Sequence, residues 1–433
     1  MNTCRKYFLI WCILINLHFA CKKEKDTQPP VISILSPFEN QTFYADEDVV
    51  IQGTITDETV LEKASVTLLN DRGQPVHRTL SIAIASKNQI LNLSYLLDNI
   101  HLESGTYKLS VFASDGKNDS HTDISIYIVG VPKVLDKIVI ATASTTSQTD
   151  ISMIDSTGTI IPFTNFSGDH LDVSVNSYFQ ELFHCGSASG NFSGISLSDK
   201  RIVVNVPCVP SSSVPYFTGF FAENNNYYMA FYNEQIMGYD HTGNIIYNAK
   251  ALPGYFAKQL WLNDQHLIVE QQNKITDEQR LVCYFSTGAA QQNCTLTQEV
   301  VAFFERDETH ILVFGNKAGQ GVIQEYDRIA NNLWSPYPYT LTYGTVTCAI
   351  KLDDDSFLLA CSNGNIYKYA YSTSSVTLYL TGYEAIQMVL DDLNNAFYVV
   401  EKNKINKLDM QGKPIQVYNS TAAILKIGLL YNK

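Results

Sequence analysis

The sequence is poor in several features that mark common protein classes. It has three tryptophans in 433 residues, and charged residues make up only 17% of the chain. Basic residues number 30 against 43 acidic ones, and they form no cluster in the body of the chain. A formal charge of −13 without a basic patch argues against nucleic acid as a partner. Helical periodicity is hard to find after the first twenty residues, which argues against a helical fold.

Motifs of well-known enzymes are also missing. The sequence contains no Gly-x-Ser-x-Gly, no His-Glu-x-x-His and no phosphate-binding loop. No two cysteines have the spacing of a zinc knuckle, and Asp353, Asp354 and Asp355 lack the alternation of a calcium loop. We therefore expect no catalytic residue, no metal and no cofactor, although motif searches leave the question of enzymatic activity open.

Hydrophobic residues and tyrosine, in contrast, are abundant. The hydrophobic fraction is 45%, and 26 tyrosines accompany 21 phenylalanines. Tyrosine fits the half-buried surface of a pleated sheet, so this composition favours a globular all-β protein.

The first twenty residues have the pattern of a secretory signal peptide. Arg5 and Lys6 precede an apolar run over residues 7–19, which is shorter than the roughly 20 residues of a membrane-spanning helix. Cys21 follows directly after Ala20, and residues 22–30 form a polar stretch suited to a tether.

This arrangement resembles the lipobox and export tag of Bacteroidetes-type surface lipoproteins. The resemblance implies that Cys21 is lipidated and becomes the mature N-terminus, anchored in the outer membrane or at the cell surface. The match departs at His18, because the lipobox usually has an aliphatic residue three positions before the cysteine. The alternative is an ordinary signal peptide followed by a coincidental cysteine.

Residues 31–130 alternate and turn like a β-sandwich. Strands are expected at residues 31–35, 49–55, 64–69, 76–80, 89–95, 105–113 and 122–129. The count and size resemble an immunoglobulin-like domain, without the antibody-type disulfide, and Tyr107 stands where such folds often carry a tyrosine corner. Bacterial domains of this class commonly act as spacers, and an adhesin head is the alternative.

Residues 134–433 contain a recurring apolar strand. Seven such runs begin 39–49 residues apart, at Lys137, Tyr178, Tyr227, His266, His310, Ser356 and Ala396. This period is typical of four-stranded propeller blades. Asp-x-x-Gly turns, as at Asp155 and Gly158, follow several third strands, where the carboxylate is expected to form the turn. The region resembles YVTN, NHL and quinoprotein-like β-propellers, which implies seven blades.

The ends of this region predict how the ring closes. The first repeat begins at its second strand, near residue 137, and one strand remains after the last repeat, at residues 422–430. We expect these two segments to complete a single blade, which removes open sheet edges. The predicted fold is an all-β chain with an immunoglobulin-like β-sandwich followed by a seven-bladed β-propeller closed by the C-terminal strand.

Six cysteines remain beyond the leader, which contains Cys4 and Cys12. An even number in an exported chain favours disulfides. Cys283 and Cys294 are centred on one predicted turn, and Cys348 and Cys361 on another, so we predict both pairs to be bonded. Cys185 with Cys208 then follows by elimination.

Aromatic residues recur in the connections between repeats. The candidate binding residues are Phe166, Tyr216, Tyr255, Tyr337, Tyr339, Tyr343 and Tyr383. We expect either a ring of exposed aromatics around the channel mouth or, alternatively, wedges buried between blades. His266 and His310 both begin a second strand, which favours a shared turn role.

These features predict a lipid-anchored cell-surface protein that binds or adheres to a protein or glycan, and that is a monomer. Two alternatives stay open, because propellers serve many functions. One is a polysaccharide lyase or hydrolase with a site at the central channel, and the other is a scaffold of an outer-membrane assembly.

The lipidation of Cys21 can be tested directly. The Cys21→Ser variant is expected to leave the membrane fraction, because it lacks the thiol that would carry the lipid. Cell fractionation and mapping of the mature N-terminus measure the effect, with Cys12→Ser as the matched control. Full membrane retention of Cys21→Ser would contradict the lipoprotein interpretation.

Overall fold

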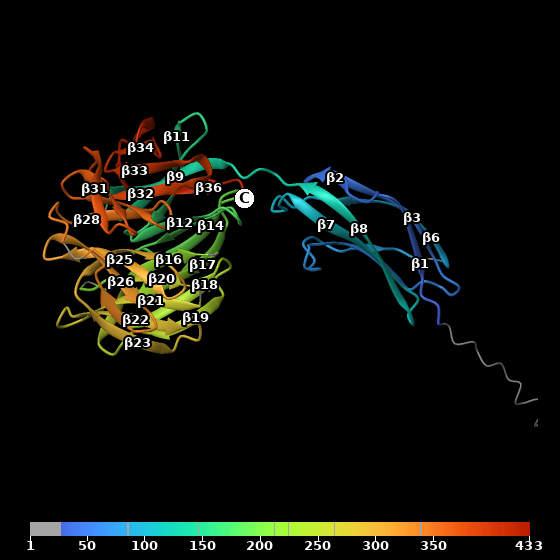
Figure 1. Ribbon diagram of the computed structural model, residues 1–433, viewed down its shortest axis with the longest axis horizontal. Helices are drawn as coiled ribbons and strands as arrows, with labels where there is room; N and C mark the ends of the chain where they lie inside the picture. Colours follow the sequence, from blue (N-terminus) through green and yellow to red (C-terminus); the bar gives the residue numbers. More distant parts are fainter. Residues whose placement is uncertain are drawn as a thin grey trace, which may run out of the picture. The chain divides into compact units, whose positions relative to one another are not determined.

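The computed structural model describes residues 27–84, 86–145, 147–211, 213–223, 225–263, 265–337 and 340–433. The predicted leader and Cys21 lie outside these ranges. Every regular element in them is a strand, except the 3-10 turn η1 (Asp392–Asn394). The chain forms two compact units that divide after Pro132, and each is all-β (Figure 1). No helix in the described ranges is long and apolar enough to cross a membrane.

The first unit consists of two sheets. One has the order β1-β3-β6, and its strands are β1 (Val31–Ser36), β3 (Asp48–Thr56) and β6 (Asn88–Leu96). The other has the order β2-β8-β7-β4-β5, and its strands are β2 (Gln41–Tyr44), β8 (Asp119–Val129), β7 (Gly105–Ser114), β4 (Lys63–Leu69) and β5 (Leu80–Ile82). One apolar core that includes Val49, Val66 and Ile126 joins them, because alternate side chains of each strand face the other sheet.

Two details of the first unit differ from the sequence prediction. Strand β2 was not predicted, since its four residues are too few for a clear alternation, and it pairs in parallel with β8. The strand predicted at residues 76–80 lies instead at β5. Tyr107 donates its hydroxyl hydrogen bond to the carbonyl oxygen of Glu103, 2.9 Å away.

The second unit repeats a four-stranded antiparallel sheet, which is the architecture of a β-propeller. Within the described residues there are seven such sheets, and we call their strands A to D in hydrogen-bonded order. The A strands are β36 (Ala423–Tyr431), β12 (Asp172–Asn176), β16 (Phe217–Glu223), β20 (Tyr255–Asn263), β24 (Glu299–Glu305), β28 (Val346–Lys351) and β32 (Gln387–Asp391). The B strands are β9 (Leu135–Thr145), β13 (Glu181–Cys185), β17 (Asn226–Phe231), β21 (His266–Asn273), β25 (His310–Lys317), β29 (Ser356–Cys361) and β33 (Ala396–Glu401).

The third and fourth strands complete each sheet. The C strands are β10 (Gln148–Ile154), β14 (Phe192–Ser196), β18 (Gln235–Asp240), β22 (Gln279–Phe285), β26 (Gln320–Asp327), β30 (Asn365–Ala370) and β34 (Lys404–Asp409). The D strands are β11 (Ile160–Ser167), β15 (Ile202–Val206), β19 (Ile245–Lys250), β23 (Ala290–Leu296), β27 (Asn332–Trp334), β31 (Ser375–Thr381) and β35 (Pro414–Asn419). All seven recurring runs fall on B strands, although Tyr178 itself lies in the turn before β13.

Apolar clusters join successive sheets. Each cluster takes side chains from two neighbouring sheets, as where Phe183 of β13 packs with Phe217 of β16 and Tyr227 of β17. The same holds around the unit, and one cluster joins Tyr398 of the last sheet to Ile140 of the first. B strands carry buried residues on both faces for this reason, which explains their continuous apolar runs.

The Asp-x-x-Gly segments form turns, as predicted. Asp155 Oδ1 accepts backbone N–H bonds from Thr157 at 2.9 Å and from Thr159 at 3.0 Å, and Gly158 has φ +84°. Asp240 and Gly243 repeat this geometry. These carboxylates are therefore occupied by their own turns.

The C-terminal strand pairs with the beginning of the second unit. Strand β36 is antiparallel to β9, with Ile427 opposite Ile140 and Leu430 opposite Lys137. In Figure 1, red β36 lies beside teal β9. The expected pairing of the last strand with the segment at residue 137 is therefore confirmed.

Deleting residues 421–433 should destabilise the second unit, because β9 and the last sheet both lose β36 as a neighbour. We expect insoluble or protease-sensitive protein. In a chain that begins after the leader, Trp261 and Trp334 are the only tryptophans, so their fluorescence reports this unit alone. Removing residues 22–26 is the control, and unchanged melting of the truncated chain would show that the pairing is dispensable.

Candidate functional site

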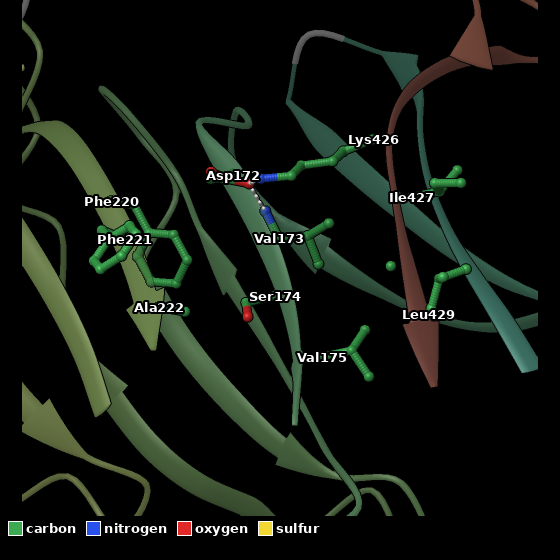
Figure 2. Close-up of a pocket in the computed structure, with 11 residues that line it drawn as sticks. Asp172, Val173, Ser174, Val175, Phe220, Phe221, Ala222, Lys426, Ile427 and Leu429 are labelled. Atoms are coloured by element: carbon green, nitrogen blue, oxygen red, sulfur yellow. Dashed lines mark hydrogen bonds and ion pairs between the residues drawn. The ribbon is translucent and has the colours of Figure 1, made fainter. Parts of the chain in front are cut away.

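A cavity of about 270 Å³ lies between three A strands of the second unit. Strands β36, β12 and β16 belong to three consecutive sheets, and each is an edge strand that pairs only with its own B strand. The A strands of successive sheets contact one another, as β36 does β12 and β16 does β20, so the cavity opens at the inner edge of the ring of sheets. Figure 2 shows its wall, with β12 between β36 and the rings of Phe220 and Phe221.

Two glycines explain why space remains at this place. A Cβ atom on Gly428 of β36 would lie 2.6 Å from Val175 Cγ2, so β36 packs closely against β12. A Cβ atom on Gly219 of β16 would collide with the carbonyl oxygen of Lys258, so β16 packs closely against β20. Strand β12 thus packs closely against β36, and β16 packs closely against β20. The cavity remains between β12 and β16.

The polar part of the wall is a charge-balanced pair. Lys426 Nζ of β36 donates a hydrogen bond to Asp172 Oδ1 of β12, and the same oxygen accepts the Val173 backbone N–H at 2.6 Å. The Lys426 and Asp172 side chains are 32% and 21% exposed, so solvent reaches both. Ser174 adds a hydroxyl on the same strand. The cavity therefore offers donors and acceptors without net charge.

The opposite wall is aromatic. The Phe221 ring lies 5.4 Å from that of Trp261, and the Phe220 ring lies 5.8 Å from that of Phe192. Both phenylalanines are half-buried, but they lie on opposite faces of β16: Phe220 packs on the side of the cavity, and Phe221 packs toward the following sheet.

The buried His184 and the half-buried His170 lie beside this site. The rings of His170 and His184 are 5.4 Å apart, and His184 stacks on Phe166 at 4.8 Å. His184 Nε2 lies 3.2 Å from Thr149 Oγ1, while Nδ1 of both histidines is buried without a hydrogen-bond partner among the described residues. Burial lowers the pKa of His170 to about 4 and that of His184 to about 3, so both rings are neutral at pH 7.

Asp169 precedes His170 and shapes the adjoining loop. Its carboxylate accepts backbone N–H bonds from four successive residues, at 2.8–3.1 Å, namely Ser187, Ala188, Ser189 and Gly190. Burial acts to raise the pKa of Asp169, but these four bonds outweigh it and lower the pKa to about 2. The hydrogen bonds of the Asp169 carboxylate thus go to the backbone of the loop at residues 187–190.

The aromatic residues predicted for binding are dispersed over the unit rather than gathered at this cavity. Phe166, Tyr216, Tyr255, Tyr337 and Tyr383 are half-buried, and Tyr339 lies outside the described residues. Tyr343 is 38% exposed and stacks on Tyr367 at 4.3 Å. Of the described candidates, Phe166 stacks on His184 beside the site, and Tyr216 packs in the same apolar cluster as Phe220.

The predicted disulfides are corrected by the structure, in which all six cysteines of the described residues are free. Cys283 stands opposite Gln292, and Cys294 stands opposite Leu281, so the two thiols are offset by two residues. The prediction assumed a symmetric turn, whereas a register shift follows Cys283.

The other two predicted pairs fail for related reasons. Cys348 packs toward the following sheet and Cys361 toward the preceding one, because a register shift between Val346 and Cys348 turns them to opposite faces. Cys185 and Cys208 contribute to one apolar cluster but each thiol donates to a different backbone carbonyl.

The remaining sequence candidates lie at the starts of strands, as His266 and His310 do, or in a turn, as Asp355 does. His310 lies 2.9 Å from Asp307 Oδ1, and Arg328 Nη1 lies 3.3 Å from His266 Nε2. Asp355 accepts the Ser372 backbone N–H at 2.6 Å, within the turn region predicted for it. In the part of the chain that the structure describes, no three His, Cys, Asp or Glu residues are grouped to hold a metal ion.

The residues that line the cavity were missed by sequence analysis. One signal was available, since Lys426 is the single charge in the apolar run of residues 422–430. Asp172, Ser174 and the two phenylalanines gave no comparable signal, because they meet only when β12 and β16 are placed side by side.

No known protein family matches the sequence, and no curated protein matches it either. Solved structures with similar folds include a quinoprotein alcohol dehydrogenase-like protein from Bacteroides thetaiotaomicron, with 13% identity and a TM-score of 0.46 over 93% of this chain and 99% of that one. A functionally unknown protein from Desulfotomaculum acetoxidans has 11% identity and a TM-score of 0.48, over 67% and 98%. The Pan2 WD40 domain of Neurospora crassa has 9% identity and a TM-score of 0.46, over 58% and 79%. Nothing about function follows from similarities of this size.

The buried His184 predicts acid sensitivity of the second unit. Because the folded-state pKa of about 3 lies below the ordinary value of 6.5, the unfolded chain binds the extra proton between these values. The stability that His184 contributes is therefore complete above pH 6.5 and falls as the pH drops toward 3, by about 1.4 kcal/mol per pH unit.

Urea unfolding of the His184→Gln variant at several pH values, followed by tryptophan fluorescence, measures this effect. We expect a smaller loss of stability between pH 6.5 and 4 than in the parent chain. The control is His121→Gln, at an exposed position of the first unit. An unchanged slope in His184→Gln would show that His184 is not the group that titrates.

Proposed function

We propose that this chain is an exported, lipid-anchored cell-surface protein that binds or adheres to a protein or glycan ligand. The apolar leader, Cys21 and the polar stretch at residues 22–30 support export and anchoring. In this proposal the second unit carries the binding site, and its axial cavity receives part of the ligand.

The proposed architecture assigns a role to each unit. The seven four-stranded sheets are the blades of a seven-bladed propeller, closed where β36 adds to β9. The first unit is an immunoglobulin-like spacer, which its two packed sheets and the Tyr107–Glu103 hydrogen bond favour. A spacer would hold the propeller away from the membrane without contributing binding residues.

The observation that carries the proposal is the composition of the cavity wall. The Lys426–Asp172 pair and the Ser174 hydroxyl line the same space as the Phe220 ring. A few convergent polar groups against an apolar wall are the usual features of a ligand site.

The rival is a propeller-type enzyme, such as a polysaccharide lyase or hydrolase. His170 and His184 are titratable groups near the cavity, but their pKa values of about 4 and about 3 make them weak bases at pH 7, which favours the binding protein over this rival. An enzyme would release shortened products from a captured polysaccharide, whereas a binding protein would return it unchanged.

Ligand capture by the chain from residue 22 onward tests the proposal, with a glycan array and a pull-down from surface material as the two assays. We expect capture that is lost in Ser174→Leu, because leucine fills the cavity, and retained in the control Ser286→Leu, at an exposed turn. Capture that survives Ser174→Leu in both assays would place the binding site elsewhere, and product release would favour the enzyme.

A further inference from the structure

The chemistry of the axial cavity specifies the class of ligand that fits it. Resting on the function proposed above, we propose that the cavity binds one ring of a neutral carbohydrate. Three features of the cavity favour this ligand: its size, the balance of charge on its wall, and the Phe220 ring beside it.

Size limits the occupant to a single ring. The cavity of about 270 Å³ falls just below the range of about 300–1,000 Å³ that is usual for drug-sized ligands. A longer chain would have to continue out of the cavity along the inner edge of the sheets. A terminal or branching sugar is therefore the part that enters.

Charge balance favours a neutral occupant. Lys426 and Asp172 form an ion pair on the wall, so an anion near Lys426 would also face Asp172, and a cation near Asp172 would also face Lys426. A hydroxyl group avoids this conflict, because it accepts from the ammonium and donates to the carboxylate at once. Binding a charged ligand would require the pair to be broken.

The free hydrogen-bonding groups match a polyol. The Lys426 ammonium has three N–H donors, and one of them is given to Asp172 Oδ1. Among the described residues no donor reaches Asp172 Oδ2, and Ser174 Oγ has no partner there either. Adjacent sugar hydroxyls could bond all of these groups, whereas an apolar ligand would leave them without partners.

The aromatic wall suits the apolar face of a sugar. Phe220 of β16 stands on the other side of β12 from β36 (Figure 2), and its ring lies 5.8 Å from that of Phe192. One side of a pyranose carries C–H groups that pack against such rings, and the other side carries hydroxyls toward Lys426 and Asp172. A single sugar ring therefore contacts both the aromatic and the polar wall of the cavity.

Three sugars that share one ring and differ in charge test the proposal. D-glucose, D-glucuronate and D-glucosamine are titrated into the chain from residue 22 onward at pH 7, and binding is followed by ligand-observed NMR. We expect the neutral sugar to bind about tenfold tighter than either charged one, the ratio expected when one polar group in the site loses its partner. The free amino acid L-phenylalanine is a fourth ligand, which carries both charges and an aromatic ring. We expect it to bind more weakly than glucose.

Removing the charge of Lys426 or of Asp172 should change which of the three sugars binds most tightly. Lys426→Met leaves Asp172 unbalanced, so glucosamine should become the preferred sugar, and Asp172→Asn should make glucuronate preferred. Lys258→Met is the matched control, because it breaks the ion pair with Glu299 on other strands and should leave the order unchanged. Circular dichroism and tryptophan fluorescence establish that each variant is folded.

The outcomes separate this proposal from the function on which it rests. If no sugar of any charge binds, or if a charged sugar or phenylalanine is preferred by the parent chain, the neutral-carbohydrate proposal is wrong. In that case loss of capture in Ser174→Leu would still support a binding site in the cavity. If the two charge variants keep the parent order, the ion pair does not set selectivity and the proposal also fails.

Discussion

The pairing of β36 with β9 is the constraint on which the second unit depends. Each sheet of this unit buries its two faces against neighbouring sheets, so a first and a last sheet would each leave an apolar face in water. Adding the C-terminal strand to the N-terminal sheet removes both ends at once, because Ile424 and Ile427 of β36 pack with Tyr398 of the last sheet while Leu430 packs with Leu182 of the second. The strands within residues 146–422, which lie between the two partners, are thereby held in one closed set of contacts.

The cavity is a consequence of the same closure. Because β36 must contact both the last sheet and β12, Gly428 allows it to approach Val175 closely, while Gly219 lets β16 approach β20. The inner edges of β12 and β16 are drawn apart, although Phe183, Phe217 and Tyr227 keep their sheets packed further out. A charged pair and the Phe220 ring face the resulting space, so the site combines the C-terminal strand β36 with the A strands of the second and third sheets.

The two histidines beside the cavity illustrate how packing sets chemical state. His184 lies on a B strand whose five residues are all buried, and its ring stacks between Phe166 and His170. Water is excluded, so the imidazole stays neutral far below its ordinary pKa. The neighbouring Asp169 shows the opposite result, because four backbone donors stabilise its charge despite burial. Burial keeps His184 neutral, and backbone hydrogen bonds keep Asp169 charged.

The sequence by itself determined the strands and their repetition. Runs such as residues 396–400 are apolar on both faces because B strands are covered on both sides, and Asp-x-x-Gly turns such as Asp155 to Gly158 act through local hydrogen bonds; both signals are therefore visible in the sequence. The cysteine pairs were predicted wrongly because register shifts, which depend on neighbouring strands, move Cys283 and Cys348 away from their expected partners. The tertiary structure alone decided the site, since Lys426 and Asp172 are 254 residues apart and meet only when the ring of sheets closes.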